Sequence, residues 1–242
     1  VFEATHKQTA TPVALKLINL AGRSKHDLKA LRDEISCHRR LRHPNIVRCL
    51  DSFVTRANEE VAVITELCPQ GDLMAALKLA GKFSEERVQD FASGLVNGLS
   101  FLHCKQKIIH RDLKLQNILI SSSGVLKICD FGFSQFASLT LTSVKGTPIY
   151  MAPELIQEKP YSHLVDIWAL GIILFELFTG LPPFYTTNIF KLIEMILNSQ
   201  VQYPPEISEV FTSLLVSLLQ KEPESRINWP NLREHPFLQS AK

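Results

Sequence analysis

Long apolar runs and an excess of either charge are both missing from this 242-residue sequence. The most apolar stretch, residues 167–175, is about half as long as a bilayer span, so it predicts a buried core helix. Lysine and arginine total 26 and the acidic residues 24, a formal net charge of +2, and no run of five cations occurs. These counts argue against nucleic-acid binding and against a polybasic membrane surface.

Cysteine is scarce, and its spacing follows no known pattern. The five cysteines form no C-x-x-C pair, which excludes a zinc finger and a disulfide framework and favours a reducing compartment. They are Cys37, Cys49, Cys68, Cys104 and Cys129. The first residues lack the basic and apolar regions of a signal peptide. We therefore expect a soluble, cytoplasmic protein with no membrane span.

Hydrophobic residues make up 45% of the chain and charged residues 21%, which is typical of a folded globular protein and not of a disordered one. The length fits one large domain or two small lobes, and does not separate these. Strand patterns over 13–18, 47–54 and 61–67 surround a helical pattern over 25–41. Helices dominate after a break at 68–72, with patterns from Ser84 to Leu102 and over 167–179, 189–198 and 210–220. An α+β fold follows.

Two charges fall within apolar rows of the first segment. Lys16 shares a strand face with Ala14 and Ile18, and Glu34 lies in the helical stripe of Leu31 and Ile35. A carboxylate in such a position favours a cation as its neighbour.

Polar loops flank a predicted hairpin over 118–120 and 125–129. The loop before it runs His110-Arg111-Asp112-Leu113-Lys114-Leu115-Gln116-Asn117, and Asp130-Phe131-Gly132 follows it. Because a hairpin brings its outer ends together, Asn117 and Asp130 are expected to hold a magnesium ion with a bound phosphate. Asp112 could then accept a proton from an attacking hydroxyl while Lys114 stabilises the transferring group, which indicates phosphoryl transfer.

These motifs resemble those of the eukaryotic protein kinase domain. The sequence has Val13-Ala14-Leu15-Lys16, the catalytic loop 110–117, Asp130-Phe131-Gly132 and Ala152-Pro153-Glu154 in the order of that family. The stretch 145–154, with Pro160-Tyr161 and 182–185, is similar to Fused-type and unc-51-like serine/threonine kinases. The resemblance implies a two-lobed fold, with a β-rich N-lobe over 1–67, a hinge at 68–72 and a helical C-lobe over 73–242.

The resemblance also implies roles for single residues. Lys16 would contact the ATP phosphates and pair with Glu34. Asp112 would be the catalytic base, and Lys114 would stabilise charge on the transferring group. Asn117 and Asp130 would be the Mg²⁺ ligands. The implied ATP contacts are the gatekeeper Thr65, the Glu66 carbonyl, the Cys68 amide and Asp72 near the ribose, together with Val1, Ala14 and Leu119 around adenine. Buried structural roles are implied for Asp166, which would anchor the catalytic loop, and for Arg226 as the partner of Glu154.

Residues 130–154 resemble an activation segment. Arg111 would pair with a phosphorylated residue there, Ser143 first and Thr142 second, placed by an upstream kinase or by autophosphorylation in trans. Thr147 together with Lys114 is similar to the serine/threonine class, and the implied partners are ATP and a protein substrate.

One element of the family pattern is missing. The ten glycines contain no G-x-G, whereas the family covers the ATP phosphates with a glycine-rich loop. Val1 matches the valine that ends this loop, so we expect the first strand and the loop to lie upstream of residue 1; a nucleotide-independent protein is the alternative. A kinase-fold scaffold and a small-molecule phosphotransferase are the competing functions. His38, where the family places an apolar residue, suggests sensitivity to pH.

Overall fold

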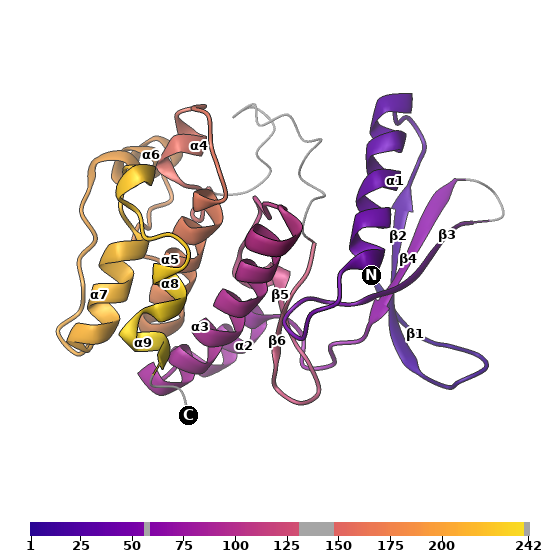
Figure 1. The fold of residues 1–242 in the computed structure, drawn as a ribbon, viewed down its shortest axis with the longest axis horizontal. Coiled ribbons are helices and arrows are strands. Elements are labelled where there is room, and N and C mark those ends of the chain that lie inside the picture. The colour runs from indigo at the N-terminus through magenta and orange to yellow at the C-terminus, as the bar shows by residue number, and fades with distance from the viewer. Residues whose placement is uncertain (56–58, 131–147, 240–242) are drawn as a thin grey trace.

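Strands gather at one end of the molecule and helices at the other, which gives two lobes (Figure 1). This computed structural model describes residues 1–55, 59–130 and 148–239. The arrangement confirms the predicted α+β, two-lobed fold.

Four antiparallel strands form the sheet of the smaller lobe, in the order β1-β2-β4-β3. They are β1 (Phe2–Thr5), β2 (Pro12–Asn19), β3 (Cys49–Val54) and β4 (Glu60–Glu66). The register of β2 with β4 sets Ala14 opposite Thr65 and Lys16 opposite Val63. Residues with different predicted roles in ATP binding therefore come from adjacent strands.

One helix, α1 (Lys25–Arg40), packs on this sheet. Ser24 and Asp27 form a capping box, in which each side chain accepts a hydrogen bond from the other residue's backbone amide. Leu31 and Ile35 of the helix form a small core with Cys49 and Val63 of the strands. The predicted apolar stripe is thus the buried face of α1, and His38 is buried with it.

The segment 67–72 joins the lobes and lies on a small two-stranded sheet. That sheet is the predicted hairpin, made of β5 (Ile118–Ile120) and β6 (Leu126–Ile128). The Ile120 amide donates to the Gly71 carbonyl at 2.9 Å, and the Gln70 amide donates to the Ile120 carbonyl at 3.3 Å. Asp72 then caps α2 (Leu73–Ala80), since its Oδ1 accepts from the Ala75 amide at 2.8 Å.

A second segment of the smaller lobe is held by the same hairpin. The Val47 amide donates to the Ile128 carbonyl, and the Ile128 amide donates to the Asn45 carbonyl, both at 2.9 Å. The Asn45 side chain also donates to the Leu126 carbonyl at 3.0 Å. The two lobes are therefore joined at β5 through the chain connection and at β6 through residues 45–47.

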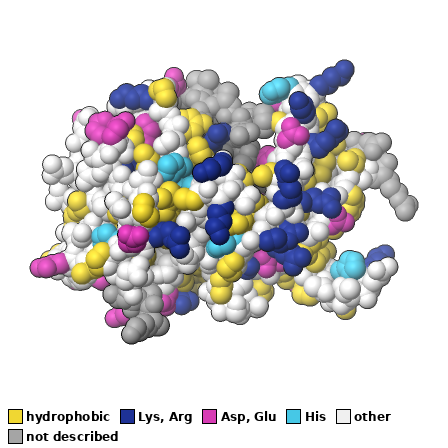
Figure 2. All heavy atoms as spheres, in the orientation of Figure 1, with side chains coloured by type: hydrophobic (Ala, Val, Ile, Leu, Met, Phe, Trp, Pro, Cys, Tyr) yellow, Lys and Arg dark blue, Asp and Glu magenta, His cyan; other side chains and the backbone are white. Residues whose placement is uncertain are grey.

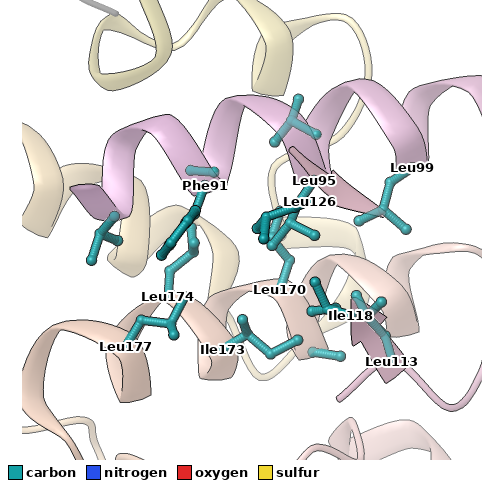
Figure 3. Close-up of a cluster of buried hydrophobic side chains, with 14 of the residues drawn as sticks. Phe91, Leu95, Leu99, Leu113, Ile118, Leu126, Leu170, Ile173, Leu174 and Leu177 are labelled. Atoms are coloured by element: carbon teal, nitrogen blue, oxygen red, sulfur yellow. The ribbon is translucent and has the colours of Figure 1, made fainter. Parts of the chain in front are cut away.

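The core of the larger lobe lies between α3 (Glu85–Ser100) and α5 (Leu164–Thr179), with the hairpin packed beside them (Figure 3). Helix α3 continues as a π-helical turn over Phe101–Gln106. Helix α5 is buried from Val165 to Leu177, which confirms the core helix predicted from its apolar run. Leu95 and Leu99 of α3 and Leu170 and Leu174 of α5 are fully buried there.

Shorter elements complete this lobe. They are the 3₁₀ turns Leu115–Asn117 and Pro223–Ser225, α4 (Pro153–Ile156), α6 (Ile189–Asn198), α7 (Glu209–Leu218), α8 (Asn231–Glu234) and α9 (Pro236–Gln239). In the parts of the chain that the structure describes, no helix is both long and apolar enough to cross a membrane.

Candidate active site

A buried carboxylate of α5 fixes the backbone of the loop before the hairpin. Asp166 is 1% exposed and accepts from the His110 amide at 2.7 Å and from the Arg111 amide at 2.8 Å. His103 Nε2 lies 2.8 Å from its Oδ2. Burial alone would raise the pKa of Asp166, but the hydrogen bonds from His103 and His110 hold this pKa below its ordinary value. Asp166 therefore anchors the loop as predicted.

His110 links this loop to the residue before Asp130. The ring is fully buried, and its Nε2 donates to the Cys129 carbonyl at 2.9 Å. The Asp112 amide donates to Nδ1 of the same ring at 3.3 Å. Since one ring nitrogen donates and the other accepts, these contacts fit the neutral tautomer protonated at Nε2. The ring thus ties the backbone of Asp112 to that of Cys129.

The Asp112 carboxylate accepts from two neighbours on the loop. Lys114 Nζ lies 3.0 and 2.7 Å from its two oxygens, and Asn117 Nδ2 donates to Oδ2 at 3.0 Å. Asn117 Nδ2 also donates to the Asp112 carbonyl at 2.8 Å, which leaves the Asn117 amide oxygen to bind a cation. About half of the Asp112 side chain is exposed, so a substrate hydroxyl has access to it.

Lys16 of β2, in the smaller lobe, reaches Asp130, which follows β6 in the larger lobe. Lys16 Nζ donates to Asp130 Oδ1 at 2.5 Å, although 114 residues separate them. Both side chains are partly exposed. Asp130 has φ +56°, in the left-handed region that non-glycine residues seldom adopt, and Arg111 has φ +70°. Strained backbone of this kind is typical of functional sites.

The predicted pair between Lys16 and Glu34 is wrong for this structure. Lys16 forms its ion pair with Asp130, whereas Glu34 Oε1 is buried without a hydrogen-bond partner among the described residues. Burial raises the pKa of Glu34 to about 8, although the charge of Lys16 opposes this rise. The physical reason is that two carboxylates compete for one ammonium group. Lys16 pairs with Asp130 instead of with Glu34, its predicted partner.

The predicted nucleotide contacts come from both lobes. Ala14 and Thr65 are partners across β2 and β4, and Cys68 is buried just after β4. Leu119 lies on β5, where it bridges to Asp72. Val1 is 82% exposed at the start of β1, and its predicted place beside adenine is untested. Of these residues, Leu119 and Asp72 meet where the segment 67–72 lies on β5.

Two predicted contacts already have other partners. The Asp72 carboxylate caps α2, so a ribose would share it with the Ala75 amide. The Glu66 side chain accepts from the Arg48 amide at 2.8 Å and from Lys127 at 2.9 Å, which leaves its predicted backbone role unaffected.

Arg111 precedes Asp112 in the chain, and its Nε is buried without a hydrogen-bond partner among the described residues. Its guanidinium lies 5.4 Å from the centre of the Tyr161 ring. The predicted phosphorylation sites Ser143 and Thr142 lie outside the described residues, as do Phe131 and Gly132. Tyr161 is a neighbour of Arg111 that sequence reasoning did not identify.

The predicted pair of Glu154 and Arg226 is confirmed as a buried, bidentate ion pair. Arg226 Nη1 and Nη2 donate to the two Glu154 oxygens at 2.8 and 3.1 Å. Each residue is 3% exposed. The Leu164 carbonyl accepts another bond from Arg226 at 2.8 Å, so the pair attaches α4 to the start of α5.

A pocket of about 630 Å³ opens beside Asp112 and Lys114. Its wall includes Glu176 of α5, which accepts a 2.6 Å hydrogen bond from the Tyr150 hydroxyl. Burial raises the pKa of Glu176. Tyr150 was not identified as a site residue from the sequence, although it stands within the stretch 145–154 that carries the family resemblance. The pocket volume is within the ordinary range of ligand-binding pockets.

Comparison with known proteins agrees with this geometry. The family model described as "Protein kinase domain" matches residues 1–238. The chain is 47% identical to "Serine/threonine-protein kinase 36" of Pongo abelii over 241 residues, which is 98% of this chain and 18% of that protein. It is 47% identical to "Serine/threonine-protein kinase TIO" of Arabidopsis thaliana over 245 residues, 100% of this chain and 18% of that one.

A third relative is "Serine/threonine-protein kinase fused" of Drosophila melanogaster, at 40% identity over 242 residues, which is 99% of this chain and 30% of that protein. The chain thus spans under a third of the length of these relatives. Because the family model and the relatives cover nearly every residue of the chain, the chain belongs to the protein kinase family, and the relatives that it resembles are serine/threonine kinases.

Proposed function

We propose that this domain transfers the γ-phosphate of ATP to serine or threonine hydroxyls of proteins. The observation that carries the proposal is the Asp112 carboxylate, which lies between Lys114 and Asn117 on a loop anchored by Asp166. A half-exposed carboxylate held in this way can accept the proton of a hydroxyl group as that hydroxyl attacks phosphorus. The names of the relatives support serine and threonine as the acceptors.

The residues of the chain have separate tasks in this proposal. Asp112 orients the acceptor hydroxyl and takes its proton, while the Lys114 ammonium stabilises negative charge on the transferring group. Lys16 would hold the α- and β-phosphates, which requires it to leave or share Asp130. Thr65, the Glu66 carbonyl and the Cys68 amide would position adenine, with Val1, Ala14 and Leu119 packed around it.

Asn117 and Asp130 fit a magnesium site that is completed by substrate. Both offer hard oxygen atoms, and among the described residues no group of three or more His, Cys, Asp or Glu side chains could hold a metal ion. Magnesium typically binds through one or two protein oxygens together with phosphates and water, which suits this pair. When bound, Mg²⁺ would neutralise charge on the phosphates, and Asn117 and Asp130 would hold it.

The proposal also includes regulation by phosphorylation and a cytoplasmic location. Arg111, with its buried Nε, is suited to pair with a phosphate on Ser143 or Thr142, added by an upstream kinase or in trans by a second copy. All five cysteines are free, which supports a reducing, cytoplasmic compartment.

The test is phosphate transfer from Mg-ATP to a library of serine, threonine and tyrosine peptides. We expect transfer to serine and threonine, and a loss of about 10²- to 10⁴-fold in kcat for Asp112→Asn. Asp130→Ala is expected to abolish transfer through loss of the metal ligand. Asp90→Asn, at an exposed position of α3, is the matched control and should keep full activity. Full transfer by Asp112→Asn would overturn the assignment of the base, and peptide binding without transfer by the wild type would favour the scaffold.

A further inference from the structure

Arg111 is a partly buried cation. Figure 2 shows many Lys and Arg side chains over α1, where they lie at the surface, as charged side chains usually do. Arg111 is less exposed, and its Nε is buried. Among the described residues, no carboxylate forms an ion pair with its guanidinium. Its neighbour is an aromatic ring, since the guanidinium carbon lies 5.4 Å from the centre of the Tyr161 ring.

Tyr161 stands in the turn that leads into α5. Pro160 precedes it, and the proline ring fixes the backbone at that position. After it, the Ser162 hydroxyl accepts from the Leu164 amide at 3.3 Å, and the Ser162 carbonyl accepts from the Val165 amide at 3.3 Å. The backbone is therefore constrained on both sides of Tyr161, which gives the ring a defined position.

The start of α5 holds Arg111 at two points. Asp166, five residues after Tyr161, accepts from the Arg111 amide at 2.8 Å, while the Tyr161 ring contacts the guanidinium. Arg111 has φ +70°, a left-handed conformation that is unfavourable for a residue with a Cβ atom. Contacts at the amide and at the end of the side chain both oppose relaxation of this backbone. The conformation of Arg111 in turn sets the direction of the next residue, Asp112.

We propose that Tyr161 is a positioning residue for Asp112, because its ring holds the Arg111 guanidinium and so keeps the strained backbone beside the base in place. This inference rests on the proposed function, in which Asp112 accepts the proton of the substrate hydroxyl. A cation is attracted to the face of an aromatic ring, so the contact needs the ring of Tyr161 and not its hydroxyl. Without the ring, the backbone of Arg111 can relax and turn the Asp112 carboxylate away from the acceptor.

The test measures kcat and KM for transfer from Mg-ATP to the best serine peptide of the library, with phosphatase-treated protein. Tyr161→Leu should lower kcat about two- to fivefold, the factor that corresponds to an exposed cation–π contact, and leave KM for ATP unchanged. Tyr161→Phe keeps the ring and should retain the wild-type kcat. The matched control is Tyr185→Leu, which removes an exposed tyrosine of the same lobe and should change neither constant.

Glycine at position 111 tests the role of backbone strain. Since glycine adopts positive φ without a steric penalty, the backbone of Arg111→Gly needs no support from the ring, and Tyr161→Leu should have no further effect on kcat in that background. Arg111→Ala keeps a Cβ atom without the guanidinium, so its kcat should be lower than that of Arg111→Gly. Thermal unfolding of every variant establishes that it is folded.

Nuclear magnetic resonance reports the contact without catalysis. The side-chain protons of Arg111 should show an upfield ring-current shift that Tyr161→Phe keeps and Tyr161→Leu loses. The inference is overturned if Tyr161→Leu retains the wild-type kcat, if Tyr161→Phe loses as much, or if Tyr161→Leu has the same effect in the Arg111→Gly background. Transfer by the wild type that does not depend on Tyr161 rejects this inference alone, whereas no transfer by the wild type rejects the proposed function with it.

Discussion

Lys16, Glu34 and Asp130 lie close enough to influence one another electrostatically, but the Lys16 ammonium forms its ion pair with Asp130. Asp130 holds Lys16 directly, and its negative charge raises the pKa of Glu34 further. Glu34 is therefore protonated over much of the neutral range, since its pKa lies at about 8. The hydrogen-bonding state of the site depends on which carboxylate Lys16 contacts.

This arrangement predicts a pH dependence of stability. The pKa of Glu34 is raised from 4.5 to about 8 on folding, so the folded state binds more protons than the unfolded state between these values. Stability contributed by protonated Glu34 should therefore fall as pH rises through that window. We expect Glu34→Gln to remove this loss, so that its stability relative to the wild type increases between about pH 5.5 and about pH 7.5. Urea unfolding at the two pH values measures the difference.

The matched control is Asp33→Asn, an exposed neighbour on the same helix, whose stability relative to the wild type should not change with pH. His38 titrates in part of the same range, but burial lowers its pKa, so it contributes the opposite slope. Comparison of each variant with the wild type removes that common contribution. A parallel pH profile for Glu34→Gln and the wild type would contradict the prediction.

The burial of single residues could be predicted where it followed from the local hydrophobic pattern. The apolar rows around Lys16 and Glu34 predicted that both charges lie on apolar faces, and both residues are partly buried on β2 and α1. The partner of Lys16 could not be predicted in the same way, because Asp130 follows it by 114 residues and the contact depends on the backbone of a distant loop. The roles assigned to Asp112, Asn117 and Asp130 stay predictions.

At the scale of elements, α5 and α7 pack closely at one glycine. A Cβ atom added to Gly171 of α5 would lie 2.7 Å from Leu219 Cδ2 and 3.0 Å from Leu218 Cβ. We expect Gly171→Ala to destabilise the fold by about 1–2 kcal/mol, because overpacking outweighs the better helix propensity of alanine. Urea unfolding measures the change.

A double-mutant cycle with Leu219→Ala tests the cause. Leu219→Ala removes the two nearest atoms, Leu219 Cδ2 at 2.7 Å and Cγ at 2.9 Å, and leaves Leu218 Cβ at 3.0 Å, so in that background Gly171→Ala should be much less destabilising. The expected coupling is at least about 1 kcal/mol in favour of the double variant. Strictly additive effects would show that the crowding is not the cause.

Most elements could be predicted because their periodicity was local and clear. The hairpin, α1, α3 and the buried run of α5 match their predicted ranges closely. Helix α2 was passed over, although Asp72 is a good N-cap and Leu73–Ala80 consists of strong helix formers. The π-helical turn at the end of α3 could not be predicted, because its apolar residues continue the helical spacing.

At the scale of the whole molecule, Asn45 belongs in sequence to the smaller lobe but is bonded to the larger one. We expect Asn45→Ala to cost about 1–3 kcal/mol, since its side chain is buried and the Leu126 carbonyl would lose its donor. Hydrogen exchange should accelerate at the Val47 and Ile128 amides, which lie in the same contact. Asn97→Ala, at an exposed position of α3, is the control and should change neither quantity.

Among the described residues, the backbone hydrogen bonds between the lobes all involve the hairpin of β5 and β6. Gly71 and Gln70 are bonded to β5, and Asn45 and Val47 are bonded to β6. Two bodies fastened at two separate points retain essentially one rotation, about the line that joins those points. The cleft should therefore open and close by a swing about the hairpin, with little twisting or sliding. The C-terminal end of α1 lies next to this rotation axis, so it should move least relative to the larger lobe. The N-terminal end of α1 should move most.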